Sequence, residues 1–113
     1  MFSLPTHPNT NVVSAVVTGG HGSGIHNQAI ANYVTELIYI DALGRARTLK
    51  RNYHGELFYQ FLHSFGTLGI IVELKLEITK AYYIKKCIYE QVPWNDLLTS
   101  VHFDNLNYRN DYV

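Results

Sequence analysis

The amino-acid sequence predicts an α+β fold with a mostly antiparallel sheet flanked by helices. Two β-rich segments are separated by a short turn that contains glycine, which is typical of an antiparallel hairpin. A later segment repeats apolar residues at helical spacing, and the segment after it alternates apolar and charged residues. The chain of 113 residues suits one domain, so we expect residues 1–103 to form it and residues 104–113 to be a loose tail.

The elements of the first half follow from residue type. Valine is common in strands, so the run of valine, serine and alanine predicts a buried strand over residues 12–17. One short helical turn fits residues 27–32. Aromatic and β-branched residues predict a strand over residues 33–40, and a turn at residues 41–44 returns the chain into a partner strand over residues 45–50.

In the second half the apolar period changes from two residues to the spacing of a helix. Five apolar residues define one helix face: Leu57, Phe58, Phe61, Leu62 and Phe65. Gly66 is placed to end this helix. Alternation predicts a strand over residues 72–79, and a weaker pattern predicts another over residues 82–92. Pro93 favours the first turn of a helix that we expect to begin at Trp94 and end near His102.

Composition excludes several classes of partner and site. The formal net charge is zero and no basic run exceeds two residues, so we expect no nucleic acid to bind. No apolar run approaches the roughly 18 residues of a membrane span. The six histidines lack metal-binding spacing, so no metal site is predicted. The single cysteine, Cys87, lies in an apolar run where we expect it to be packed, and one cysteine alone favours a reducing, cytoplasmic location.

The glycine segment, residues 18–24, reads Thr-Gly-Gly-His-Gly-Ser-Gly and is the most informative part of the sequence. Glycine lets the main chain lie against a ligand, and exposed N–H groups suit a phosphate or the edge of a flavin. A mobile turn is the alternative interpretation. A P-loop is excluded because Ile25 stands where lysine is required, and the glycine spacing does not fit the dinucleotide fingerprint. The segment also lacks the nucleophile elbow of hydrolases.

Leu4-Pro5 and three longer blocks of sequence carry a resemblance to a known family. The longer blocks are Val-Val-Thr-Gly-Gly-His-Gly-Ser-Gly at residues 16–24, Val-Thr-Glu-Leu followed by Asp-Ala-Leu-Gly within residues 34–44, and Phe-Gly-Thr-Leu-Gly-Ile-Ile-Val-Glu-Leu-Lys-Leu at residues 65–76. Over about residues 4–95 the chain resembles the second subdomain of the PCMH-type FAD-binding domain in oxidases of the vanillyl-alcohol-oxidase type. Alditol or xylitol oxidases and aldonolactone oxidases form the nearest branch.

The resemblance implies an α+β fold with FAD lying between two subdomains. It also implies part of an oxidoreductase that acts on CH–OH groups of a sugar, polyol or aldonolactone. By this match, ten residues would contact FAD: Thr18, Gly19, Gly20, His21, Gly22, Ser23, Gly24, Asn27, Ile70 and Ile71. The match supplies no catalytic residue.

The chain also departs from the family pattern. Gly20 stands where the family usually has threonine, and Ser14 stands where it often has glycine. The family's first FAD subdomain would precede Leu4 and its substrate-binding cap would follow residue 95, so we expect a truncated product that is inactive without these missing partners. Two alternatives stay open: a non-catalytic remnant or interaction subunit that completes a split flavoprotein, and an α+β domain that binds a plain phosphate.

Overall fold

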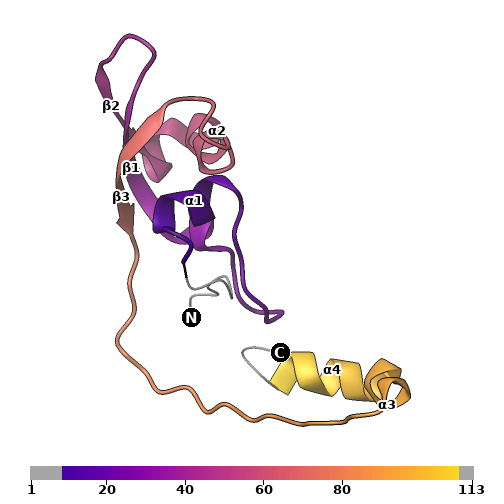
Figure 1. Cartoon of the computed structure of the whole chain (residues 1–113). Helices are drawn as coiled ribbons and strands as arrows, with labels where there is room; N and C mark the ends of the chain where they lie inside the picture. Colours follow the sequence, from indigo (N-terminus) through magenta and orange to yellow (C-terminus); the bar gives the residue numbers. More distant parts are fainter. Residues whose placement is uncertain (1–8, 110–113) are drawn as a thin grey trace.

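The computed structural model describes residues 9–109 and confirms an α+β fold (Figure 1). Its three-stranded antiparallel sheet has the order β2-β1-β3. The strands are Val34–Ile40 (β1), Ala46–Lys50 (β2) and Ile70–Leu76 (β3). The helices are α1 (Val12–Val17), the 3-10 helix η1 (Ile30–Tyr33), α2 (Arg51–Leu62), α3 (Trp94–Leu98) and α4 (Ser100–Arg109).

The hairpin of β1 and β2 forms as its turn residues predict. Ile40 lies opposite Ala46, and the turn between them is closed by Asp41. The Asp41 carboxylate accepts hydrogen bonds from the main-chain N–H groups of Leu43 (2.9 Å) and Arg45 (3.0 Å). It also accepts from Nε of Arg45 (2.9 Å) and Nε of Arg47 (3.2 Å). These donors, with the main-chain N–H of Arg45 foremost, hold the pKa of Asp41 well below its usual range.

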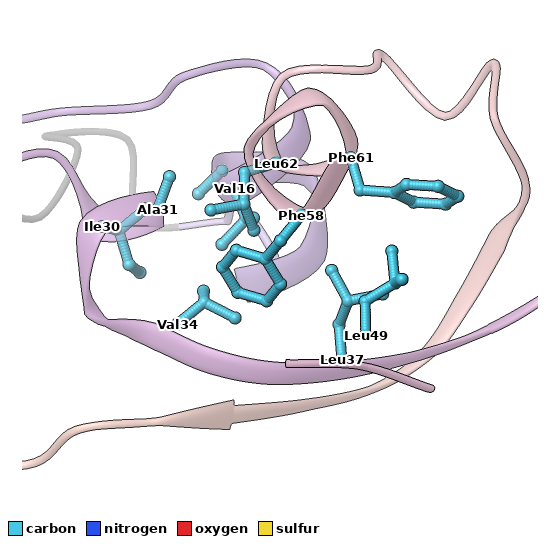
Figure 2. Close-up of a cluster of buried hydrophobic side chains, with 10 residues drawn as sticks. Val16, Ile30, Ala31, Val34, Leu37, Leu49, Phe58, Phe61 and Leu62 are labelled. Carbon is cyan, nitrogen blue, oxygen red and sulfur yellow. The ribbon is translucent and has the colours of Figure 1, made fainter. Parts of the chain in front are cut away.

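The core lies between one face of the sheet and the helices α1, η1 and α2. Figure 2 shows the buried side chains gathered there, with Phe58 reaching from α2 towards β1. Among the residues whose burial the structure describes, ten apolar ones are buried: Ala15, Val16, Ile30, Ala31, Val34, Leu37, Leu49, Phe58, Phe61 and Leu62. The ring of Tyr39 extends this core by packing against Phe61, with 4.2 Å between ring centroids. Burial of these apolar side chains is the main force that holds the sheet to the helices.

Residues 12–17 form helix α1, so the strand predicted there is wrong. Asn11 caps the helix: its Oδ1 accepts a hydrogen bond of 2.7 Å from the main-chain N–H of Ser14. The helix buries Ala15 and Val16. A cap at each end and a buried face outweigh the modest preference of valine for strands.

Helix α2 confirms the predicted apolar face only in part. Phe58, Phe61 and Leu62 are buried, whereas Leu57 and Phe65 are exposed. The helix is capped at His63, before the predicted stop at Gly66. Its first turn is separated from the rest by Gly55, whose main chain is not helical (φ +50°, ψ −118°).

The strand predicted over residues 82–92 is absent: the chain there is extended but pairs with no strand among the described residues. Cys87 is exposed in this stretch, which corrects the expectation that it is packed. Sequence preference alone cannot make a strand, because each strand needs a neighbour to hydrogen-bond with. By contrast, the strand predicted over residues 72–79 is confirmed as β3, which begins and ends earlier at Ile70–Leu76.

The helix expected to begin at Trp94 is confirmed, but Thr99 breaks it with an extended main chain (ψ 128°). The following helix α4 continues to Arg109, so residues 104–109 are helical where we expected a loose tail. Residues 110–113 lie outside the described part of the chain. The helical turn expected over residues 27–32 is observed slightly later, as η1.

Candidate functional site: the glycine segment

The glycine segment begins as the cap of helix α1. Gly19 donates a hydrogen bond to the carbonyl of Val16 (3.3 Å), and Gly20 donates one to the carbonyl of Ala15 (2.6 Å). Gly19 has φ +70°, a main-chain conformation that is unfavourable for residues other than glycine. This pair of hydrogen bonds, with a left-handed residue just beyond the helix, defines a Schellman motif. The first two glycines therefore have a structural role that the sequence interpretation missed.

Thr18 is also turned back towards α1. Its N–H and its hydroxyl both donate to the carbonyl of Ser14, at 3.1 and 2.7 Å. Together with the Schellman motif, this means that the N–H groups of Thr18, Gly19 and Gly20 are used within the protein. Among the described residues of the predicted cradle, the N–H groups left for a ligand are those of His21, Gly22 and Gly24.

The stretch from His21 to Gly24 differs from residues 18–20 in its main-chain hydrogen bonds. Within residues 9–109, the main-chain N–H groups of His21, Gly22 and Gly24 make no hydrogen bond. Carbonyl oxygens of this stretch are used instead: Asn27 donates from its N–H to Gly24 (3.1 Å) and from Nδ2 to Ser23 (3.1 Å). Asn27 therefore fixes the shape of the loop. The N–H groups of His21, Gly22 and Gly24 are then available to a ligand.

His21 is exposed and folds onto its own loop. Its Nδ1 lies 2.9 Å from the carbonyl oxygen of Gly22. A carbonyl only accepts, so Nδ1 carries the proton in this contact. In the neutral imidazole the other nitrogen, Nε2, is then an acceptor. The loop thus offers main-chain donors together with one side-chain acceptor.

The loop that follows α2 lies against the start of the glycine segment. Phe65 donates its main-chain N–H to the carbonyl of Val17 (3.1 Å). A Cβ atom built on Gly19 would lie 3.4 Å from Cδ2 of His63, so the two residues are in contact. Sequence reasoning did not find His63 because the contact joins segments distant in the chain.

Ile70 and Ile71 are placed away from the outer part of the glycine segment. They begin β3 and lie opposite Ile40 and Tyr39 at the end of β1. The glycine segment instead leads through η1 into the beginning of β1. Among the described residues, no hydrogen bond or ring contact joins Ile70 or Ile71 to residues 21–24. The two predicted halves of the FAD contact are therefore not joined by a hydrogen bond or ring contact among the described residues.

A second concave site was not predicted. It is a pocket of about 250 Å³ at the start of α2, lined by Thr35, Glu36, Lys50, Arg51, Asn52, Tyr53, Lys75 and Glu77. Two of its cations are paired, with Nζ of Lys50 3.3 Å from Glu36 and Nη1 of Arg51 3.5 Å from Glu77. These ion pairs leave little net charge, so nothing in this pocket specifies a ligand.

Arg51 has a clear structural task in that region. Its Nε donates to the carbonyl of Val34 (2.9 Å), and Nη2 donates to the carbonyls of Asn32 (2.8 Å) and Val34. The guanidinium therefore ties the first turn of α2 to the junction of η1 and β1. No group of three histidine, cysteine or acidic side chains fit to hold a metal ion occurs in the part of the chain that the structure describes.

Comparison with known proteins confirms the resemblance to sugar and polyol oxidases. The chain is 29% identical over 98 residues to the alditol oxidase of a Streptomyces species. It is 32% identical over 80 residues to a protein of Neurospora crassa named as a putative D-arabinono-1,4-lactone oxidase. It is 27% identical over 99 residues to the D-arabinono-1,4-lactone oxidase of Saccharomyces cerevisiae.

These similarities cover most of this chain but little of the relatives. They span 84%, 71% and 82% of the chain, against 22%, 14% and 19% of the three relatives. The chain therefore spans about a fifth or less of the length of the curated relatives that it matches. No family model matches the sequence. Among the described residues, no helix has the length and apolar character needed to cross a membrane.

Proposed function

We propose that this chain is an FAD-binding portion of an oxidoreductase that acts on CH–OH groups of a sugar, polyol or aldonolactone. The observation that carries the proposal is its similarity to an alditol oxidase and two D-arabinono-1,4-lactone oxidases over most of its length. In such a protein FAD would supply the hydride acceptor. The chain itself would bind and orient the cofactor.

The residues present fit a flavin or its diphosphate. The N–H groups of His21, Gly22 and Gly24 make no hydrogen bond to other described residues, and such donors suit carbonyl and phosphate oxygens. Ser23 and Asn27 belong to the same loop, and Asn27 fixes its shape. In this proposal Thr18, Gly19 and Gly20 hold the loop to α1 and act as positioning residues. Ile70 and Ile71 stay in the proposal as contacts with a more distant part of FAD.

A titration of the purified chain with FAD tests the proposal. We expect saturable binding that changes the flavin absorbance spectrum, and we expect Gly22→Val to weaken it because a branched side chain covers the exposed N–H groups. Gly22 has no positive φ, so the substitution brings no main-chain strain. Ala42→Val is the matched control, since Ala42 lies exposed in the turn between β1 and β2. Failure to bind FAD, or equal loss in both variants, would contradict the proposal.

We further propose that substrate oxidation needs polypeptide beyond these 113 residues. The curated relatives are several times longer than this chain, which matches 22% or less of each of them. The partners would be a further FAD subdomain and a substrate-binding cap. The purified chain is therefore expected to show no oxidation of alditols or aldonolactones with FAD present. Turnover by this polypeptide alone would contradict this part of the proposal.

An alternative function is a non-catalytic subunit that completes a split flavoprotein. The exposed apolar residues beyond β3 favour it, because exposed apolar surface commonly marks contact with protein. Co-expression with a separately encoded FAD subdomain would distinguish the two: the alternative requires a stable complex with restored flavin binding. Parallel titration with a simple nucleotide separates FAD binding from plain phosphate binding.

The lone, exposed cysteine supports the proposed cytoplasmic location.

A further inference from the structure

The outer edge of β3 has no strand beside it in the part of the chain that the structure describes. The sheet order β2-β1-β3 places β3 at one side of the sheet, and within residues 9–109 its only strand partner is β1. An unpaired edge presents free main-chain N–H and C=O groups and can accept another extended segment. β3 contains no proline, and Val72 is 57% exposed. This strand therefore has no proline that would block the addition of a neighbour, and its charged residues are Glu73 and Lys75.

The segment that follows β3 has the properties of an unpaired strand. We call residues 78–92 the arm; it runs from β3 towards α3 in a path (orange in Figure 1) that bends at Gln91, where φ is +56°. The arm makes no hydrogen bond with any other described residue. Its large apolar side chains are exposed: Ile78, Tyr82, Tyr83, Ile84, Ile88, Tyr89 and Val92. Aromatic and β-branched residues of this kind favour a strand once a partner is present.

The sequence disfavours the pairing of the arm with β3 of its own chain. Such a hairpin would need a reverse turn directly after Leu76. The residues from Glu77 to Ala81 include no glycine, proline, asparagine or aspartate, which are the usual turn formers. Glu77 instead continues the line of β3, since its N–H donates to the carbonyl of Tyr33 (2.8 Å). The arm is therefore directed away from its own sheet.

The exposed area and the charges both fit a second copy of the chain. The accessible surface is 8735 Å². A compact monomer of this mass exposes about 6300 Å², so the excess is about 2400 Å². A standard interface buries only about 800 Å² on each partner. The arm carries Lys80, Lys85 and Lys86 against one acidic residue, Glu90. β3 and its end carry Glu73 and Glu77 against one basic residue, Lys75, so net charges of opposite sign can meet. The formal net charge of zero adds no repulsion between copies.

We propose that two copies of this chain form a dimer by exchanging their arms. The arm of each copy pairs as a strand with the outer edge of β3 in the other. Such an exchange has two-fold symmetry and is closed, so both bare edges and both arms are covered at once. The inference rests on β3 and the arm alone and does not depend on flavin binding.

Sedimentation of the full chain over a range of concentrations tests the proposal. We expect a monomer–dimer equilibrium, and we expect Ile88→Pro to weaken the dimer at least about tenfold because proline removes a strand N–H. Ile88→Val keeps both the N–H and the β-branched side chain, so it is the matched control and should dimerise as the parent does. Ile88 is exposed and outside the core, so neither change disturbs the fold.

Two further measurements identify the surfaces involved. Lys85→Glu should weaken the dimer, and adding Glu73→Lys in the same chain should restore it. Cys87 is the only cysteine, so a spin label there should give dipolar coupling in the dimer and none in the Ile88→Pro variant. A chain that stays monomeric at every concentration overturns the proposal. A dimer that is indifferent to Ile88→Pro, or an arm that folds onto its own β3, overturns it equally.

Discussion

The main-chain N–H of Phe65 donates a hydrogen bond of 3.1 Å to the carbonyl of Val17. This contact joins the end of α1, from which the glycine segment emerges, to the loop between α2 and β3. The two loops therefore form one unit whose first part is held rigidly. The main-chain N–H groups of His21, Gly22 and Gly24, which follow, make no hydrogen bond to other described residues and remain for a ligand. The division between a structural part and a binding part leads to the predictions below.

Gly19→Ala should destabilise the fold by about 1–2 kcal/mol, because alanine at φ +70° is strained and ends the Schellman motif less well. The new Cβ would lie 3.4 Å from His63, which is an ordinary contact, so strain of the main chain is the main cost. Urea denaturation measures the change. Gly22→Ala, which has no positive φ, is the control, and an equal loss in both variants would disprove the special role of Gly19.

Gly69→Ala should cost more, about 2–4 kcal/mol. A Cβ there would lie 2.7 Å from Cδ2 of Tyr39 and 2.8 Å from the carbonyl oxygen of Ile40, and the residue has φ +150°. Gly44 is the matched control because it has φ +74° but open space around its Cβ position. Gly44→Ala should therefore lose only about 1 kcal/mol. Similar unfolding free energies for the two variants would mean that the close approach at Gly69 does not matter.

Asp41→Asn should lower stability in a pH-dependent way. The pKa of Asp41 in the folded chain lies below its unfolded value of about 4. Its contribution is therefore present above the unfolded pKa and is lost as the pH falls towards the folded pKa. Thermal unfolding of both proteins should show a lower midpoint for Asp41→Asn at pH 7 and a shrinking difference below pH about 4. A difference in unfolding midpoint that widens as the pH falls would contradict a lowered pKa for Asp41.

Arg51→Lys should destabilise the fold by about 2 kcal/mol, because a single ammonium cannot replace the guanidinium bonds to the carbonyls of Val34 and Asn32. The ion pair with Glu77 is longer (3.5 Å), and the Glu77 side chain is 59% exposed. Glu77→Gln should therefore cost less than about 0.5 kcal/mol. If Glu77→Gln lowers the free energy of unfolding as much as Arg51→Lys does, the ion pair rather than the carbonyl contacts secures this junction.

Local signals explain which elements could be predicted from the sequence. The hairpin was predictable because its turn chemistry lies within a few residues, at Asp41 and Gly44. Helix α1 was not predicted although its signals are local too: Asn11 and the pair Gly19 and Gly20 cap the helix, but the valine content of residues 12–17 favoured a strand. The strand expected over residues 82–92 failed for a different reason, since its formation needs a partner that sequence periodicity does not supply.

The candidate site could likewise be predicted from the sequence only in part. The glycine segment was recognisable from composition, but its internal division depends on hydrogen bonds from Gly19 and Gly20 to α1. The contact of His63 with Gly19 and the binding of Arg51 to carbonyls of η1 and β1 join distant segments. No spacing pattern in the sequence marks such contacts, so they were visible only in the folded chain.

The most direct test of the central claim is an FAD titration of the chain followed through main-chain amide resonances. The account predicts progressive, saturable shifts at His21, Gly22 and Gly24, with much smaller changes at Thr18, Gly19 and Gly20, whose N–H groups are already bonded to α1. Unchanged resonances over residues 21–24 at saturating FAD, or larger shifts at residues 18–20, would contradict it.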